Sequence, residues 1–147
     1  MARLLSLDEA LERILDRVHA LPSEVVPLAE AAGRVLAAPA LAAADLPPFP
    51  SSAMDGYALR AGDTPGILPV AFRVAAGSPS PVVLPAGSAA AIATGGVVPE
   101  GADAVVPIER TGESNGRVEI PEAAVGGAHI RPRGGDVRAG ETVVGAG

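Results

Sequence analysis

From Asp45 onward the sequence changes character, because helical periodicity ends and short apolar runs alternate with turn residues. The chain contains 18 glycines and 15 prolines among 147 residues, so long helices would be interrupted often. Short apolar runs bounded by such residues predict strands. The strands that we expect cover residues 56–60, 69–75, 89–94, 103–109, 116–120 and 141–144. Strands at this spacing favour a compact β-sandwich or a barrel-like module.

The clearest hairpin pattern in this module is the turn Glu113-Ser114-Asn115-Gly116. Asn-Gly is a preferred dipeptide for the tight turn between two antiparallel strands. We therefore expect this turn to join the apolar runs at 105–109 and 117–120.

Two helices are predicted before the β-rich part. Ser6 and Glu9 have the Ser-x-x-Glu spacing of a capping box, and apolar residues then recur on one helical face over residues 6–21. A shorter helix is predicted over 28–37, although Gly33 weakens it by about 1 kcal/mol relative to alanine. The apolar face of the first helix needs a partner surface, on this chain, on a missing domain or on another subunit.

The predicted fold class is α+β, with N-terminal helices followed by a mostly β, barrel- or sandwich-like module. Residues 1–22 form the amphipathic helix, 23–44 and 138–147 form linking segments, and 45–137 form the β-rich module.

Composition excludes several classes of function. The formal net charge is −6, and nucleic-acid binding depends on clustered cations, so we expect no nucleic-acid partner. The absence of cysteine excludes disulfides, zinc-thiolate sites and thiol catalysis, and is compatible with the cytoplasm. No apolar run approaches the ~20 residues that span a bilayer, so we expect no membrane partner.

The first candidate site lies in the proline-rich stretch that ends at Asp55-Gly56. Prolines restrict the backbone before this turn dipeptide, with Ser51 and Ser52 beside it. A carboxylate on a rigid turn can hold a metal ion or accept a hydrogen bond from a ligand. An ordinary tight turn has the same residues, so both interpretations stay open.

Two further loops have residues suited to anions. Thr94-Gly95-Gly96 follows an expected strand, and successive N–H groups with a Thr hydroxyl can face an anion, although no Walker A lysine is present. In Arg131-Pro132-Arg133-Gly134-Gly135-Asp136, the guanidinium groups suit phosphate or a tetrahedral oxyanion. The alternative is a solvated charged turn. His19 and His129 have no metal-ligand spacing.

These three loops, in this order, resemble the N-terminal part of the MoeA family of molybdopterin molybdenumtransferases, which includes the E domain of gephyrin. The matching residues are Pro-Phe-Pro-Ser-Ser-Ala-Met-Asp-Gly-Tyr-Ala at 48–58, Thr-Gly-Gly-Val-Val-Pro-Glu-Gly-Ala-Asp-Ala-Val-Val at 94–106 and Arg-Pro-Arg-Gly-Gly-Asp-Val at 131–137. The resemblance covers essentially the whole chain. Ser51 departs from it, because the family usually has asparagine there.

The resemblance implies a function for the parent protein. Members of the family insert molybdate into adenylylated molybdopterin, release AMP and use a divalent cation, usually Mg²⁺. They are elongated, multidomain, cytoplasmic homodimers whose active site lies between subunits. The chain would then be a fragment that lacks the pterin-binding domain and is inactive alone. The alternative is a non-catalytic dimerisation or scaffold module of the same family.

The resemblance also assigns roles to the three loops. Asp55 would hold Mg²⁺ or position the substrate, Thr94 would donate a hydrogen bond, and Asp136 would orient the arginines or the pterin. The expected catalytic and substrate-binding residues are Asp55, Thr94 and Asp136, with Ser52, Arg131 and Arg133. These roles require the three loops to converge on one concave wall.

Overall fold

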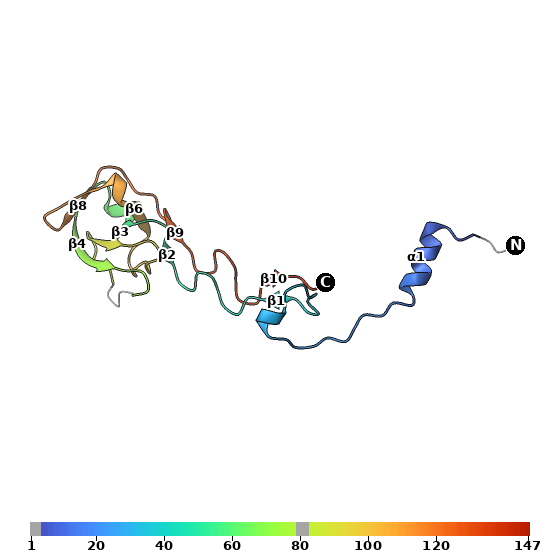
Figure 1. Ribbon diagram of the computed structural model, residues 1–147. Coiled ribbons are helices and arrows are strands. Elements are labelled where there is room, and N and C mark those ends of the chain that lie inside the picture. The colour runs from blue at the N-terminus through green and yellow to red at the C-terminus, as the bar shows by residue number, and fades with distance from the viewer. Residues whose placement is uncertain (1–3, 79–82) are drawn as a thin grey trace. The chain divides into compact units, whose positions relative to one another are not determined.

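The computed structural model describes residues 4–78 and 83–147, which form two units. One unit ends at Pro39 and takes in Gly145–Gly147, and the other is Ala40–Val144 (Figure 1). Of the helices in the described part, none is both long enough and apolar enough to cross a bilayer.

The N-terminal unit contains one α-helix among its described residues, α1 (Leu7–Leu15). The predicted capping box is confirmed, because Glu9 N donates to Ser6 Oγ at 3.2 Å and Ser6 N donates to Glu9 Oε2 at 2.9 Å. The helix ends six residues before the predicted end at residue 21. No residue of α1 is buried, and a short helix without tertiary packing is marginal in water.

The second predicted helix, over 28–37, is wrong. Only a single 3₁₀ turn forms there, at Leu28–Glu30, and the backbone turns left-handed at Gly33 with φ +77°. The apolar side chains of Leu28 and Val35 are exposed, so no packing stabilises further helix. The described chain is therefore mostly β with one α-helix, and not a fold with several N-terminal helices.

The second unit is built on one six-stranded sheet with the order β6-β3-β5-β4-β8-β7. Every neighbouring pair is antiparallel except β4 and β5, which are parallel. The strands are β3 (Gly56–Leu59), β4 (Gly66–Val74), β5 (Ala89–Ile92), β6 (Ala104–Pro107), β7 (Gly112–Ser114) and β8 (Arg117–Ile120). Each of the first five strand ranges predicted for the module overlaps one of these strands. Two further 3₁₀ turns are at Ala61–Asp63 and Ile108–Arg110.

The predicted turn at Asn115-Gly116 is confirmed, because both residues have positive φ, at 51° and 71°, as a type I′ hairpin requires. It joins β7 to β8. The predicted first strand of this hairpin is wrong. Residues 104–107 form β6, which pairs with β3 at the opposite edge of the sheet.

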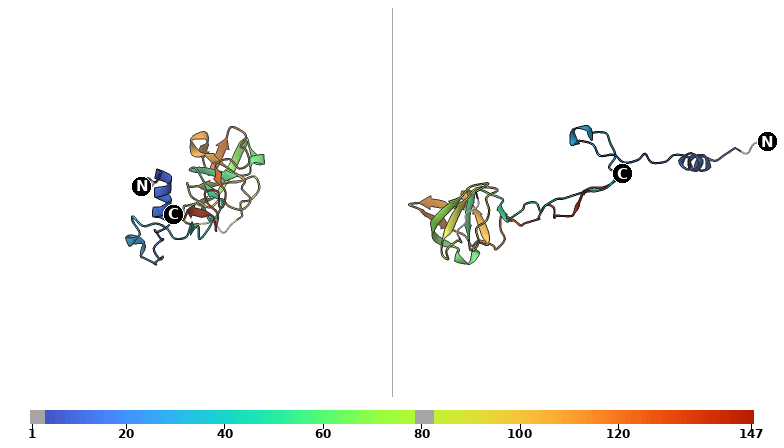
Figure 2. Two further views of the ribbon diagram at one scale, coloured as in Figure 1. Left: turned by 90° about the vertical axis from the view of Figure 1, so that its right-hand side faces the viewer. Right: turned by 90° about the horizontal axis from the view of Figure 1, so that it is seen from below.

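The sheet is curled (Figure 2). One core of buried side chains fills its inner face. Val106 of β6 and Ile120 of β8 belong to the same buried cluster, although these strands lie toward opposite edges of the sheet. Tyr57, with 1% of its surface exposed, is the largest side chain of that cluster. A second cluster, around Leu84 and Ile92, covers the other face.

A stem of paired segments continues from the sheet. We define the stem as residues 40–50 with 132–144. Its strands are β1 (Ala40–Leu41) and β10 (Thr142–Val144), and where it meets the sheet lie β2 (Ser51–Ser52) and β9 (Ile130–Arg131). The strand predicted at 141–144 is β10. The short strands β1, β2, β7 and β9 were not predicted.

Candidate functional site

The first and second candidate loops meet at a hydrogen-bonded pair, Asp55 and Thr94. Asp55 immediately precedes β3, and Thr94 follows β5, the antiparallel neighbour of β3. Asp55 Oδ1 accepts from Thr94 N at 2.7 Å and from Thr94 Oγ1 at 3.1 Å. Both residues are exposed to solvent. The pair is therefore a solvent-accessible polar site at the ends of two adjacent strands, where a ligand can bind.

Glycine explains why the backbone around Asp55 is fixed. A Cβ at Gly56 would lie 2.1 Å from Val106 O, so only glycine lets β3 approach β6 this closely. Ile108 N donates to Asp55 O at 3.0 Å from the segment after β6. Gly95, with φ +78°, donates its N–H to Ser52 O at 2.9 Å. The acidic turn is thus tied to both neighbouring segments.

Ser51 and Ser52 are buried, unlike Asp55. Ser52 Oγ donates to Met54 O at 2.6 Å and lies 3.3 Å from Met54 N, which donates to it. The hydroxyl therefore stabilises the turn that leads into Asp55. Ser51 is paired with Arg131 on β9 and bridged to Val97. Substrate contact by Ser52 stays a prediction.

The third loop is joined to the first through the backbone of β2 and β9, and its charged side chains pair among themselves and with the stem. Arg131 forms an ion pair with Asp136. Arg133 Nε donates to Asp45 Oδ2 at 2.7 Å. Within residues 4–78 and 83–147, neither arginine forms a hydrogen bond or ion pair with Asp55 or Thr94.

Asp45 is a partner that the sequence did not reveal. Its Oδ1 accepts from Ala139 N at 2.9 Å, and its Oδ2 accepts from Arg133. The hydrogen bond from the Ala139 amide, followed by the one from Arg133, lowers the pKa of Asp45 below its ordinary value. Asp45 thus clamps the two segments of the stem.

An open groove of about 370 Å³ begins at Asp55 and is lined by residues at the adjacent ends of β3, β5 and β4. Tyr57, Ala91 and Arg73 stand in register across β3, β5 and β4 and line it. Tyr57 Oη donates to Glu113 Oε2, and Arg73 donates to Glu113 Oε1 at 2.6 Å. Burial first, and then the bond to Glu113, raises the pKa of Tyr57 to about 12.

Arg73 and Glu113 were also missed at the sequence level. Arg73 is one isolated cation in an apolar strand, and its position opposite Glu113 depends on a register that a single sequence does not display.

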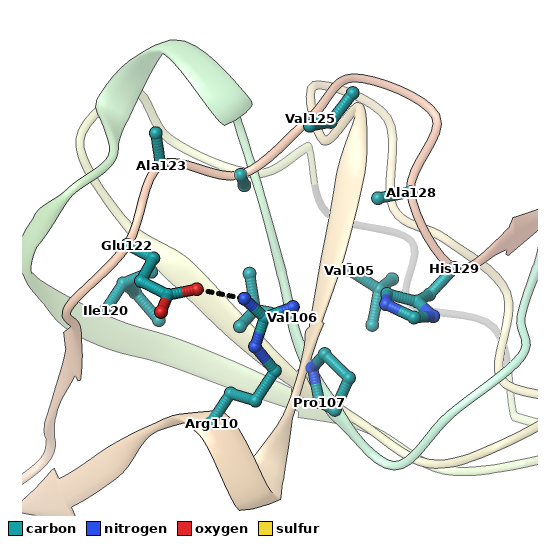
Figure 3. Close-up of a pocket in the computed structure, with 11 residues that line it drawn as sticks. Val105, Val106, Pro107, Arg110, Ile120, Glu122, Ala123, Val125, Ala128 and His129 are labelled. Carbon is teal, nitrogen blue, oxygen red and sulfur yellow. Dashed lines mark hydrogen bonds and ion pairs between the residues drawn. The ribbon is translucent and has the colours of Figure 1, made fainter.

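A smaller, mostly apolar cavity of about 140 Å³ lies between β6 and the segment that follows β8 (Figure 3). The Arg110–Glu122 ion pair lies beside it, and His129 lines it. No three His, Cys, Asp or Glu side chains of the described residues gather so that they could hold a metal ion alone.

The family described as "MoeA N-terminal region (domain I and II)" matches residues 5–147. The chain belongs to the MoeA family. Molybdopterin molybdenumtransferase 2 of Mycobacterium tuberculosis is 41% identical over 146 residues, which cover 95% of this chain and 36% of that protein. The Synechococcus elongatus molybdopterin molybdenumtransferase is 36% identical, with 98% and 38% covered.

The crystal structure of the molybdopterin biosynthesis MoeA protein from Pyrococcus horikoshii OT3 is similar to the structure of this chain. It superposes with a TM-score of 0.92 at 36% identity and covers 99% of this chain and 40% of that one. The chain therefore spans a little over a third of the length of these MoeA relatives.

Proposed function

We propose that this chain supplies one wall of the active site of a molybdenum insertase, which transfers molybdate to adenylylated molybdopterin and releases AMP. The supporting observation is the exposed Asp55–Thr94 pair, held at the end of two adjacent strands in a MoeA chain whose relatives are molybdopterin molybdenumtransferases. A fixed carboxylate and hydroxyl suit substrate positioning, because catalytic groups work best when their orientation is set in advance.

Asp55 is the residue that we assign to Mg²⁺. Its Oδ1 is occupied by Thr94, whereas Oδ2 has no hydrogen-bond partner among the described residues. Mg²⁺ is commonly held by one or two carboxylates together with water and substrate phosphates, so a single exposed carboxylate fits it. When bound, the ion would offset negative charge on the phosphates. Thr94 keeps the carboxylate oriented.

The third loop supplies positive charge in this proposal. Both arginine side chains are at least half exposed, in the ion pairs of Arg131 with Asp136 and of Arg133 with Asp45, and exposed pairs contribute at most about 1 kcal/mol. Asp45 itself is 21% exposed and keeps its bond from Ala139 N when Arg133 moves. Each arginine can therefore exchange its partner for a substrate oxyanion at little cost. Asp136 orients Arg131 before the substrate arrives. Ser52 contributes through the turn that presents Asp55.

The site is completed by parts outside this chain. We propose that the pterin-binding domain of the parent protein, and the second subunit of a cytoplasmic homodimer, form the opposite wall.

The test is a chimera in which residues 5–147 of this chain replace the matching region of the Mycobacterium tuberculosis relative. Asp55→Asn should lower molybdate-dependent AMP release roughly a hundredfold, because one preorganised charge is lost. Thr94→Val should lower it roughly tenfold, as expected when the group that orients a ligand is removed.

Thr142→Val is the matched control. It removes the hydroxyl of an exposed threonine on β10, in the stem and not beside Asp55. Circular dichroism verifies that each variant is folded. Unchanged activity in both Asp55→Asn and Thr94→Val would refute the site assignment.

A second candidate function is a non-catalytic dimerisation or scaffold module. It is favoured by the exposed apolar face of α1, where Leu7, Leu11 and Ile14 lie open to solvent. Sedimentation of the chain tests it. A dimer that dissociates in Leu11→Glu would support this function, and a strict monomer would count against it.

A further inference from the structure

Arg73 is the cation of the groove that starts at Asp55, and the sheet register fixes where it stands. Tyr57 on β3 pairs with Ala91 on β5, and Ala91 pairs with Arg73 on β4. Residues in register on neighbouring strands point to the same face of a sheet. Arg73 therefore lies on the same inner face as Tyr57, across the small side chain of Ala91.

Glu113 holds Arg73 in place from the far edge of the curled sheet. It comes from β7, and it accepts hydrogen bonds from both Tyr57 Oη and Arg73. The Glu113 side chain is 29% exposed, whereas that of Arg73 is 67% exposed. The arginine is thus anchored at one nitrogen and open to solvent over most of its surface.

Most of the hydrogen-bonding capacity of Arg73 is unused. A guanidinium group carries five N–H donors, and the described residues accept only one bond from Arg73. The sharing of Glu113 with the Tyr57 hydroxyl spreads the negative charge beside the arginine. A planar group with free, parallel donors matches the oxygens of a phosphate.

The groove between Arg73 and Asp55 has the form of a ligand site. Ala91 and Ala93 line it with small side chains, and Tyr57 and Ile92 line it with larger ones. The strands β3 and β4 are separated by β5, so the two ends of the groove are about 10 Å apart across the sheet. The volume of about 370 Å³ falls within the range of small-molecule sites. Opposite charges at its ends orient a ligand.

We propose that Arg73 binds a phosphate group of the substrate in this groove. Glu113 and Tyr57 are positioning residues, because they act through Arg73. The identity of the phosphate ligand as the nucleotide-bearing substrate rests on the proposed function. The binding of a phosphate by Arg73 is inferred from the groove and does not depend on the proposed function.

Titration of the 147-residue chain with AMP, followed by NMR of the backbone amides, tests the proposal. AMP carries a phosphate on a flat body, and adenosine is the same body without the phosphate. AMP should shift the amides of Ala91 and Ala93 with a dissociation constant of about 1 mM, and adenosine should bind at least about tenfold more weakly. Inorganic phosphate at equal ionic strength tests whether the phosphate alone suffices.

Arg73→Gln should weaken AMP binding roughly ten- to a hundredfold and leave adenosine binding unchanged. Arg73→Lys keeps the charge and the fold but loses the planar fork, so it should retain only part of the preference for AMP. Arg117→Gln is the matched control. It changes the net charge equally on the neighbouring strand β8, where Arg117 bonds to Ile67 O outside the groove.

Tyr57→Phe distinguishes positioning from a merely structural role. It removes only the hydroxyl that holds Glu113. A positioning role lowers the ratio of AMP to adenosine affinity, whereas a structural role weakens both ligands equally.

The proposal is overturned if AMP causes no shifts in the groove at millimolar concentration, if adenosine binds equally well, or if Arg73→Gln and Arg73→Lys bind AMP like the parent chain. These results are independent of the insertase assay. Normal AMP binding by Arg73→Gln with an inactive Asp55→Asn chimera would refute the role of Arg73 alone. Lost AMP binding by Arg73→Gln together with a fully active Asp55→Asn chimera would refute the role assigned to Asp55 and retain the ligand site at Arg73.

Discussion

Gly56 holds β3 against β6, and its replacement by alanine should destabilise the β-rich unit. The added Cβ would lie 2.1 Å from Val106 O, whereas ordinary contact begins at 3.4 Å, so the strands would have to separate by 3.4 − 2.1 = 1.3 Å. The three nearest atoms, Val106 O, Val106 C and Pro107 Cα, all belong to the backbone and cannot rotate away. Overpacking of this kind costs about 1–3 kcal/mol, and two weakened ladder hydrogen bonds add about 2 kcal/mol. The expected loss is about 4 kcal/mol.

Urea unfolding of the chain, followed by far-ultraviolet circular dichroism, measures this loss. The free energy of unfolding of domains of this size is only about 5–15 kcal/mol. The unfolding midpoint of Gly56→Ala should therefore shift to a much lower urea concentration, or the variant should not fold. Gly112→Ala is the matched control, because nothing lies within 4 Å of its Cβ position on β7. It should change the stability by less than about 1 kcal/mol. Equal midpoints for the two variants would refute the close-approach reasoning.

Two predictions concern titrating groups. The pKa of Tyr57, raised from 10.0 to about 12, means that the folded state keeps a proton that the unfolded chain releases. Stability should therefore fall by up to about 3 kcal/mol as the pH rises from about 10 toward 12, and absorbance of tyrosinate, from the one tyrosine of the chain, should follow it. A midpoint near 10 in the folded chain would contradict this. The lowered pKa of Asp45 means that its clamp is present above the ordinary pKa of 3.8 and is lost as the pH falls through the folded value. Asp45→Asn should speed amide hydrogen exchange at Ala139, and Asp136→Asn should not.

Local chemistry made some elements predictable. The capping box of Ser6 and Glu9 and the turn at Asn115-Gly116 depend on residues a few positions apart, and both form as predicted. The helix predicted after Leu15 and over 28–37 does not form, because such a helix needs packing against its apolar face. The apolar face there is exposed, so periodicity alone does not maintain helix.

The candidate site likewise contains some contacts that the sequence predicts and others that it does not. The pairing of Asp55 with Thr94 agrees with one part of the expectation that the three loops converge, because glycine-marked turns end adjacent strands. Arg133 instead bonds to Asp45, which is 88 residues away in sequence. Glu113 meets Tyr57 only because the sheet curls and brings β7 toward β3. Such partners depend on strand order and register, which one sequence does not display.

The pairing of β1 with β10 has a consequence for how this unit can be rearranged. Ala40 and Val144, its first and last residues, are partners in one ladder, so the polypeptide enters and leaves at the same place. A segment with adjacent ends can be exchanged between homologous proteins as a unit, or circularly permuted, without a change in its interior packing. Its two ends can be fused, and new termini can be opened at the exposed Asn115-Gly116 corner.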